Sequence, residues 1–149
     1  MIDGVFLLFT HTTLLVVFLL VPLYLYYKDR DKLSSYAVSL VFVVAVVYGL
    51  KYIFMVPRPE AAAIEVLTPR FPSGHTALIF TPPLFFRRWR CRLLFLLYGL
   101  IVAYTRLHFN VHVPIDLVTS VAIALVVSSF CLWKKDNLDR TVGYLRERF

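Results

Sequence analysis

Long apolar runs separated by short polar segments dominate the chain. Five runs are candidates for membrane-spanning helices: about Gly4 to Tyr27, Leu33 to Met55, Gly74 to Phe86, Arg92 to Leu107 and Pro114 to Trp133. The hydrocarbon core of a bilayer is about 30 Å thick and takes about 20 helical residues to cross. The pattern therefore predicts an all-α, polytopic bundle of about five transmembrane helices.

The third and fourth runs are short for a complete crossing. As a helix, the 13 residues from Gly74 to Phe86 would reach only about 20 Å, and the pair Pro82 and Pro83 should kink it. Either neighbouring residues extend these spans, or the spans begin below the membrane surface. A re-entrant hairpin over residues 74–107 is the remaining alternative.

Composition supports a membrane protein with a single domain, residues 1–149. Hydrophobic residues make up 60% of the chain, against roughly 45–50% in soluble globular proteins. No basic residue precedes the first apolar run and no small-residue cleavage site follows it, so we expect this run to span rather than to be removed as a signal peptide. The net charge is +7, but the basic residues form no stripe with aromatic residues, so we expect no nucleic-acid partner.

Most basic residues fall into three regions that a five-span chain places on the same side. These regions are the loop 28–32, the loop 87–92 and the tail 134–149. Lys and Arg gather on the cytoplasmic side of membrane proteins, so the pattern predicts a multi-pass protein of the cell membrane with an extracytoplasmic N-terminus and a cytoplasmic C-terminus. In the tail, apolar residues recur at helical spacing among charges and predict an interfacial helix.

The remaining cations fall toward the opposite side, where orientation requires no positive charge. They are Lys51, Arg58, Arg70 and Arg106. Charge in or near a membrane is costly and usually functional, and interfacial snorkelling explains the whole group less well than any one member. Lys51 and Arg58 lie seven residues apart, nearly two helical turns, so they point to one face. The Arg fork and the compact Lys charge both suit phosphate oxygens.

Polar segments at the same end of successive spans add two histidines and a carboxylate. Ser73 is a natural N-cap for the third span, whose free N–H groups offer a phosphate site, and Gly74 lets a ligand approach the backbone. His75 follows directly. His112 and Asp116 lie four residues apart and share a helix face. The carboxylate can therefore fix the tautomer of the imidazole and stabilise the cation formed when that imidazole attacks as a nucleophile. We expect the active site on the extracytoplasmic side.

A metal site is not expected at this end of the bundle. His75, His112 and Asp116 are residue types that bind metals, but the surrounding cations would repel a metal ion. Cys91 and Cys131 show neither ligand spacing nor a disulfide framework, and we interpret them as packing residues. The sequence therefore predicts metal-independent chemistry and no cofactor.

Three motifs in this order resemble the signature of the type 2 phosphatidic acid phosphatase superfamily, also called lipid phosphate phosphatases. The pattern Lys-x6-Arg-Pro matches at Lys51, Arg58 and Pro59, Pro-Ser-Gly-His matches at residues 72–75, and Ser-Arg-x5-His-x3-Asp matches at Arg106, His112 and Asp116. Thr105 replaces the usual Ser and keeps a hydroxyl. Membrane members of this family commonly have six spans. A helix missing here would leave packing surface that a second copy could cover, so a homo-oligomer stays open.

The resemblance implies a phosphatase with a histidine nucleophile. By analogy, His112 attacks phosphorus and forms a phosphohistidine, Asp116 orients His112, and His75 protonates the leaving oxygen. The groups implied to hold the phosphate oxygens are Lys51, Arg58, Arg106, the Ser73 hydroxyl and the Gly74 N–H. Phosphoryl transfer depends mostly on positioning and charge stabilisation, and these residues supply both.

The substrate implied is a lipid phosphate or diphosphate in the membrane. We favour a prenyl diphosphate, because the short loops leave little protein to recognise an elaborate headgroup; phosphatidate and phosphatidylglycerol phosphate are the other candidates. For Arg70 we expect either contact with a second phosphate or headgroup, or an interfacial ion pair with Glu60 or Glu65. His11, inside the first run, is expected to be buried and hydrogen-bonded.

Two other functions fit the same residues. The first is phosphoryl transfer to a lipid or sugar acceptor in place of water. The second is a non-catalytic membrane protein that binds lipid phosphates, against which the His75, His112 and Asp116 set argues, because binding alone needs no nucleophile.

Overall fold

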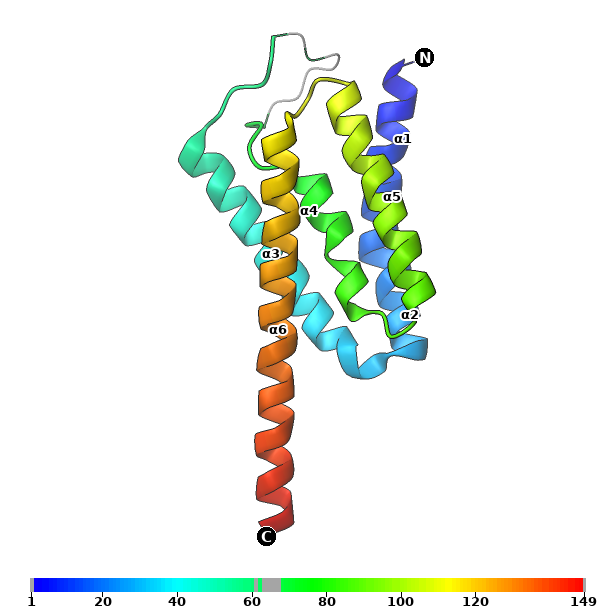
Figure 1. Ribbon diagram of the computed structural model, residues 1–149, viewed down its shortest axis with the longest axis vertical. Coiled ribbons are helices and arrows are strands. Elements are labelled where there is room, and N and C mark those ends of the chain that lie inside the picture. Colours follow the sequence, from blue (N-terminus) through cyan, green and yellow to red (C-terminus); the bar gives the residue numbers. More distant parts are fainter. Residues whose placement is uncertain (1, 61, 63–67, 149) are drawn as a thin grey trace.

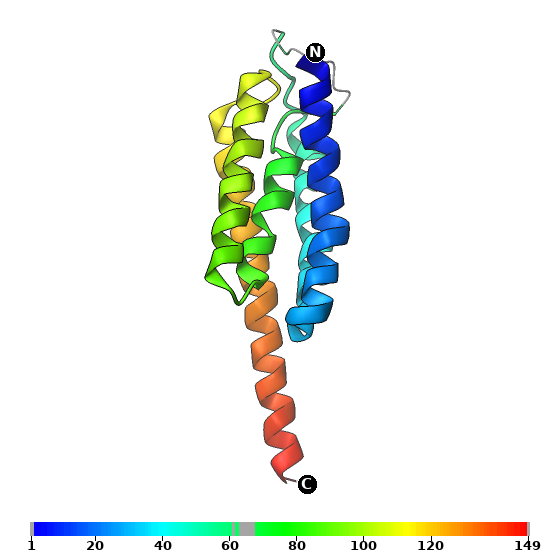
Figure 2. The same ribbon diagram turned by 90° about the vertical axis from the view of Figure 1, so that its right-hand side faces the viewer.

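The computed structural model is an elongated bundle of helices whose termini lie at opposite ends (Figures 1 and 2). It describes the backbone of residues 2–60, 62 and 68–148, and the side chains of residues 4, 8, 11–60, 62 and 68–136. The elements in chain order are α1 (Ile2–Leu15), η1 (Val16–Leu20), α2 (Val21–Lys28), η2 (Arg30–Lys32), α3 (Leu33–Phe54), α4 (Gly74–Phe80), η3 (Pro82–Phe85), α5 (Trp89–His108) and α6 (Pro114–Arg148). The expected all-α fold is confirmed.

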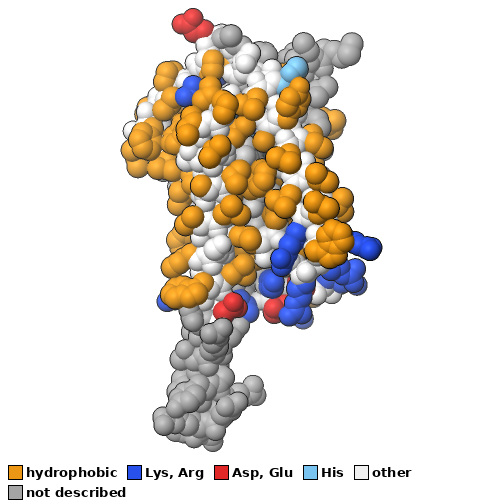
Figure 3. Space-filling view, viewed as in Figure 1, with side chains coloured by type: hydrophobic (Ala, Val, Ile, Leu, Met, Phe, Trp, Pro, Cys, Tyr) orange, Lys and Arg blue, Asp and Glu red, His pale blue; other side chains and the backbone are white. Residues whose placement is uncertain are grey.

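Four helical segments of the described chain are long and apolar enough to cross a membrane. They are His11–Lys28, Arg30–Phe54, Trp89–His108 and Pro114–Asp136. Large apolar side chains are exposed along all four, and hydrophobic groups cover the side of the bundle in Figure 3. Such a surface is suited to lipid rather than to water. The chain is a multi-pass membrane protein, as predicted.

The third expected span is the segment α4–η3, which lies inside the bundle. Residues Thr76 to Phe80 are all buried, and α4 contacts α1, α3, α5 and α6. Because other helices surround it, this segment does not need the length of a lipid-exposed span. Pro82 and Pro83 stand at the start of the 3-10 turn η3, where the proline ring is tolerated. Helix α4 begins below the end of the bundle (Figure 1), which was one of the sequence alternatives.

The fourth span is longer than the sequence indicated, since α5 begins at Trp89 rather than near Arg92. Residues 74–107 therefore run down the bundle through α4–η3 and return through α5 (Figures 1 and 2). A glycine allows these two helices to approach closely. A Cβ atom added at Gly99 would lie 2.9 Å from Cε2 of Phe80, so any larger residue would displace that ring.

The polar motifs lie at one end of the bundle, where α3 and α5 end and where α4 and α6 begin. Helix α3 ends where Met55 adopts a left-handed conformation with φ 46°, and Pro57 and Pro59 keep the following backbone extended. Ser73 is extended and precedes α4, and Pro114 is the first residue of α6, a favoured position for proline. The C-terminal ends of α3 and α5 thus meet the N-terminal ends of α4 and α6.

The opposite end carries the basic loops. Lys and Arg side chains gather at the lower end of the bundle in Figure 3, where η2 and the turn before α5 lie (Figure 1). Helix α6 continues to Arg148 without a break, so the tail is helical and stands in line with the last span (Figure 1). Its interfacial placement stays a prediction. His11 is exposed on α1, so the expected burial of this histidine is wrong, because its side chain faces outward from the bundle.

Candidate active site

A cavity of about 270 Å³ lies where the helix ends meet. It is lined by Leu14, Tyr48, Lys51, Arg58, Thr68, Gly74, His75, Leu78, Arg106, Val111 and His112. Six of the nine predicted site residues are in this set. Ser73, Asp116 and Arg70 are not. The cavity therefore has a polar wall of cations and imidazoles and an apolar wall from α1, α3 and α4.

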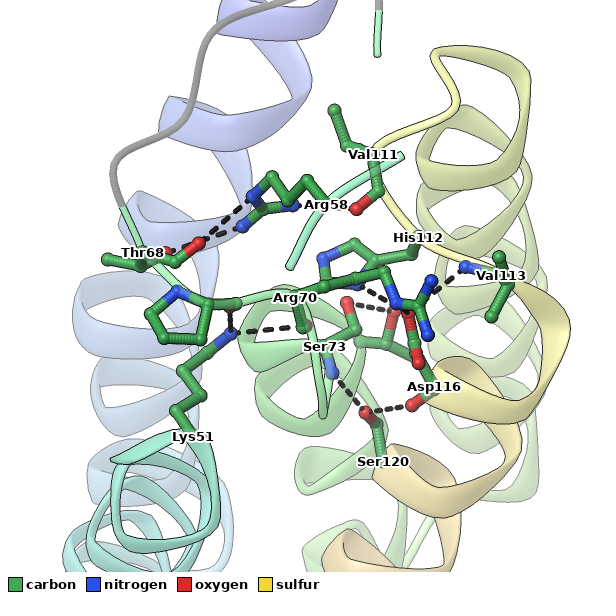
Figure 4. Close-up of polar contacts among 12 residues, drawn as sticks. Lys51, Arg58, Thr68, Arg70, Ser73, Val111, His112, Val113, Asp116 and Ser120 are labelled. Atoms are coloured by element: carbon green, nitrogen blue, oxygen red, sulfur yellow. Dashed lines mark hydrogen bonds and ion pairs between the residues drawn. The ribbon is translucent and has the colours of Figure 1, made fainter. Parts of the chain in front are cut away.

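His112 is held from behind by Asp116. Its Nδ1 atom lies 3.2 Å from Oδ2 of Asp116, and the N–H of Val113 donates to the same oxygen over 3.0 Å. Asp116 is fully buried. With Nδ1 facing the carboxylate (Figure 4), Nε2 is the ring nitrogen left for a reacting atom in the cavity.

The protonation state of His112 suits attack on phosphorus. Burial lowers the pKa of His112 to about 4, and the nearby Arg58 charge acts in the same direction. The hydrogen bond to Asp116 raises the pKa but does not outweigh burial. The imidazole is therefore neutral at neutral pH, with an electron pair available on Nε2.

Arg70 contacts the same carboxylate, and among the described residues it forms no ion pair with Glu60, one of the two glutamates expected from the sequence. Its Nε atom lies 3.0 Å from Oδ2 of Asp116, and its side chain is 20% exposed. Glu65 lies outside the described residues. The carboxylate of Asp116 therefore stands between an imidazole and a guanidinium. No sequence pattern indicated the pairing with Arg70, because Arg70 and Asp116 are 46 positions apart.

Two site cations are held by neutral backbone carbonyls. The guanidinium of Arg58 donates to the Thr68 carbonyl over 3.0 Å and to the Val111 carbonyl over 2.6 Å. Lys51 donates to the carbonyls of Pro69 and Arg70 (Figure 4). These bonds fix the head groups next to the cavity without neutralising their charge.

Arg106 supplies the third lining cation. It stands in the last turn of α5 and is 1% exposed. His75, in the first turn of α4, lines the same cavity. Lys51, Arg58 and Arg106 together oppose a positive charge on His75 while the cavity is empty. An entering phosphate anion would reverse this effect.

Ser73 occupies the predicted N-cap position of α4, but its hydroxyl does not cap the helix. The hydroxyl lies 3.0 Å from Oγ1 of Thr76, and the Ser73 N–H donates to Oγ of Ser120. Gly74, in contrast, lines the cavity. A Cβ atom at Gly74 would meet only Val47, at 3.7 Å, so the protein itself leaves room for a side chain there.

Some site residues were not found from the sequence. Ser120 donates to the backbone carbonyl of Asp116, and its position four residues after Asp116, on the same helix face, was a usable signal. Thr68 lies in a loop and holds Arg58 by its carbonyl and its hydroxyl. No periodicity marks such a residue.

A metal centre was not expected from the sequence. Among the side chains that the structure describes, no three His, Cys, Asp or Glu residues form a group that could hold a metal ion. The metal independence of the reaction stays a prediction.

The motifs and the fold point to the same family. Residues 32–140 of the 149 match the PAP2 superfamily. The chain belongs to the PAP2 superfamily. The resemblance of the three motifs to the type 2 phosphatidic acid phosphatases is thereby confirmed, and the protein is a membrane phosphatase of this superfamily with lipid phosphates as its substrate class.

The fold also has a solved counterpart. The crystal structure of Aquifex aeolicus LpxE superimposes with a TM-score of 0.73 at 24% sequence identity, over 86% of this chain and 85% of that chain. At this identity the likeness shows a shared fold. A comparison with curated proteins gave no match.

Proposed function

We propose that this PAP2 phosphatase hydrolyses a lipid phosphate or diphosphate through a phosphohistidine formed on His112. The observation that carries the proposal is the placement of one imidazole between a buried carboxylate and a cavity lined by cations. Asp116 faces Nδ1 of His112 at 3.2 Å, and the cavity on the other side is lined by Lys51, Arg58 and Arg106. A nucleophile, its orienting group and a receptor for anionic oxygens are the parts that phosphoryl transfer requires.

The site has free capacity to bind an anion. Three of its cations are partly or wholly removed from water. Lys51 donates to backbone carbonyls, and Arg58 donates to backbone carbonyls and to the Thr68 hydroxyl, all of which are neutral groups. A phosphate would add charge-assisted bonds to these same groups. The N–H of Gly74 at the start of α4 is a further donor, and the space around Gly74 lets phosphate oxygens approach it.

The first step breaks the bond between the terminal phosphorus and its leaving oxygen, which is the lipid oxygen of a monophosphate or the bridging oxygen of a diphosphate. The Nε2 electron pair of His112 attacks phosphorus, so an N–P bond forms as the P–O bond breaks. The departing oxygen takes a proton from His75 and leaves as an alcohol, or as a lipid monophosphate when the substrate is a diphosphate. Asp116 stabilises the positive charge that His112 carries in the intermediate.

The second step restores the enzyme. Water attacks phosphorus and gives a proton to His75, while the N–P bond breaks and returns its electron pair to His112. Inorganic phosphate leaves. His75 needs its proton only once substrate is bound, and a bound phosphate offsets the cations that oppose protonation in the empty cavity.

The proposed role of Arg70 is to hold Asp116. Its guanidinium lies 3.0 Å from the oxygen that also faces His112, so it favours the ionised carboxylate and restricts its rotation. A second phosphate could attract Arg70 away from this position. The structure supports the first role by contact, while the second remains a prediction.

The lipid chain has an apolar route away from the cations. Leu14, Tyr48 and Leu78 form the apolar wall of the cavity. One turn further along the same helices, Phe18 of η1 and Val44 of α3 line a groove of about 650 Å³. A hydrocarbon chain attached to a phosphate in the cavity can leave through this side of the bundle. The small cavity favours a prenyl diphosphate over substrates with larger headgroups.

The proposed orientation places the N-terminus and the active site outside the cytoplasm. Basic loops lie at the end of the bundle opposite the cavity (Figure 3), and Lys and Arg outside the active site gather on the cytoplasmic side in membrane proteins. The C-terminus would then be cytoplasmic. Labelling of a cysteine introduced at residue 62 in intact cells, but not of one introduced at Arg90, is the expected result.

The function is tested by phosphate release in the presence of a chelator. Detergent-purified protein is incubated with a prenyl diphosphate and, separately, with phosphatidate. We expect release that falls by at least about 10⁴-fold in His112→Ala and is kept in His108→Ala, whose side chain is exposed and stacks on Tyr104. A faster rate with the diphosphate selects the prenyl substrate.

Three outcomes would contradict the proposal. Release that requires a metal, or that persists in His112→Ala, would mean that the mechanism is wrong. Transfer of the phosphoryl group to an added lipid or sugar alcohol, with little release to water, would identify a transferase. Binding of both lipids without release or transfer would identify a lipid-phosphate-binding protein.

A further inference from the structure

A second apolar cavity lies at the end of the bundle opposite the active site. It has a volume of about 470 Å³ and is lined by Val16, Leu20, Val21, Tyr24, Phe86, Cys91, Leu94, Phe95 and Tyr98. None of these residues lines the active-site cavity. Residues of η1 and α2 form one wall and residues of α5 the other. These two segments flank α4 in Figure 2.

The cavity is a groove that runs along the helix axes. On α5 its lining residues are Cys91, Leu94, Phe95 and Tyr98, which are spaced as one helix face. Polar contacts connect the two walls: the Tyr24 hydroxyl lies 3.6 Å from Sγ of Cys91, and the Tyr98 hydroxyl lies 3.0 Å from Oγ1 of Thr12. Polar contacts thus connect the two walls near both ends of the groove. An acyl chain, which lies along the membrane normal, fits this direction.

A strongly basic surface adjoins one end of the groove. The loops 28–32 and 87–92 carry seven Lys or Arg residues against two Asp residues, a surplus of five positive charges. Arg87, Arg88, Arg90 and Arg92 flank Phe86 and Cys91 in the sequence and are all exposed. The contact of Arg87 with Asp29 is long, at 3.8 Å, and no acidic residue stands in the first turn of α5.

We propose that this groove and its arginines bind an anionic phospholipid of the bilayer, with an acyl chain between α5 and α1–α2 and the phosphate at residues 87–92. Charge complementarity selects this occupant. A zwitterionic lipid brings no net charge to a surface with a surplus of five cations, and a helix from a second copy would come from a chain that is itself +7. Clusters of Lys and Arg next to membrane helices attract anionic lipids, by about a factor of five for each basic residue.

The site is separate from the catalytic one. It occupies the other end of the bundle, and its lipid need not be a substrate. Its role is to fill the space between α5 and α1–α2, so a bound lipid should hold α5 in place and raise the unfolding temperature of the protein. The proposal does not depend on the identity of the phosphatase substrate.

The test uses delipidated full-length protein titrated with phosphatidylglycerol or with phosphatidylcholine of the same acyl chains. Native mass spectrometry counts the bound lipids, and thermal unfolding is followed in parallel. We expect one tightly bound phosphatidylglycerol and a higher unfolding temperature with it than with phosphatidylcholine. In the double variant Arg88→Gln, Arg90→Gln, we expect binding about 30-fold weaker, from a factor of about five for each arginine.

Two further variants separate the groove from general surface charge. Lys134→Gln with Lys135→Gln removes two charges from α6, outside the groove, and should change phosphatidylglycerol affinity by less than about twofold. Leu94→Trp fills the groove and should weaken binding while all arginines remain. Equal binding of the two lipids, or equal losses in the arginine and lysine variants, would overturn the proposal. Protein dimers in place of bound lipid would also overturn it.

Discussion

The two ends of the bundle hold their positive charges in opposite ways. Near the cavity, Lys51 is 5% exposed and Arg106 is 1% exposed. At the other end, the side chain of Arg87 is 69% exposed, and its neighbours in the loop are exposed as well. Removing a charge from water is costly unless a partner compensates for it. The buried end therefore holds the groups that must meet an anionic ligand, and the exposed end needs only water and lipid headgroups.

This comparison teaches that burial and partners, rather than residue type, separate functional from orienting cations. The site cations are fixed by carbonyls of Thr68, Pro69, Arg70 and Val111. Such bonds orient a head group but leave its charge available to a phosphate. Matched substitutions at the two ends test this distinction.

The largest difference is expected for one arginine from each end. Arg58→Gln removes a cavity charge and its bonds to Thr68 and Val111, and kcat/KM should fall by about 100- to 1000-fold. Arg90→Gln removes an exposed charge, and kcat/KM should change by less than about twofold. Phosphate release from the same lipid substrate measures both. Similar losses in the two variants would mean that burial does not identify the catalytic charges.

A smaller loss is expected at Arg70, which acts through Asp116. Arg70→Ala frees the carboxylate that orients His112, and kcat should fall by about tenfold, with partial recovery in Arg70→Lys. KM should change little. An increase in KM for a diphosphate but not for a monophosphate would instead assign Arg70 to the second phosphate, the alternative expected from the sequence.

The smallest effect concerns pH. His112 attacks as the neutral imidazole, and burial lowers its pKa to about 4, so on the acid side activity should be lost as pH falls through that region. The Arg58 charge lowers the pKa of His112 and Asp116 raises it. The acid limb of kcat/KM should therefore move to higher pH in Arg58→Gln and to lower pH in Asp116→Asn. The pH profiles of the wild-type protein and of both variants are measured with the same substrate, so that ionisation of the substrate affects all three profiles equally. If the acid limb moved in the same direction in both variants, this assignment would be wrong.

The sequence predicted the all-α fold, because local patterns determine it, and it also predicted contacts between residues that are close along one helix. Apolar runs predicted the four long helices, and the i, i+4 spacing predicted the contact of His112 with Asp116. The cavity includes Lys51 and Arg58 as expected. These features depend on residues that are neighbours along one helix or that end successive spans.

Features that depend on three-dimensional packing were not predicted. Helix α4 is enclosed by α1, α3, α5 and α6, and no hydropathy pattern reveals this enclosure. The Ser73 hydroxyl turns to Thr76 rather than toward the cavity, and Arg70 reaches Asp116 across the fold. Such contacts are decided by where loops cross the bundle, and sequence spacing carries no information about that.

The account depends most directly on a covalent intermediate at His112, and the stereochemistry at phosphorus tests it without requiring the intermediate to accumulate. A lipid phosphorothioate made chiral with oxygen isotopes is hydrolysed in isotopically labelled water, and the configuration of the released thiophosphate is determined. Two successive in-line displacements, first by Nε2 of His112 and then by water, predict overall retention of configuration. Inversion would show a single displacement by water and would contradict the phosphohistidine mechanism.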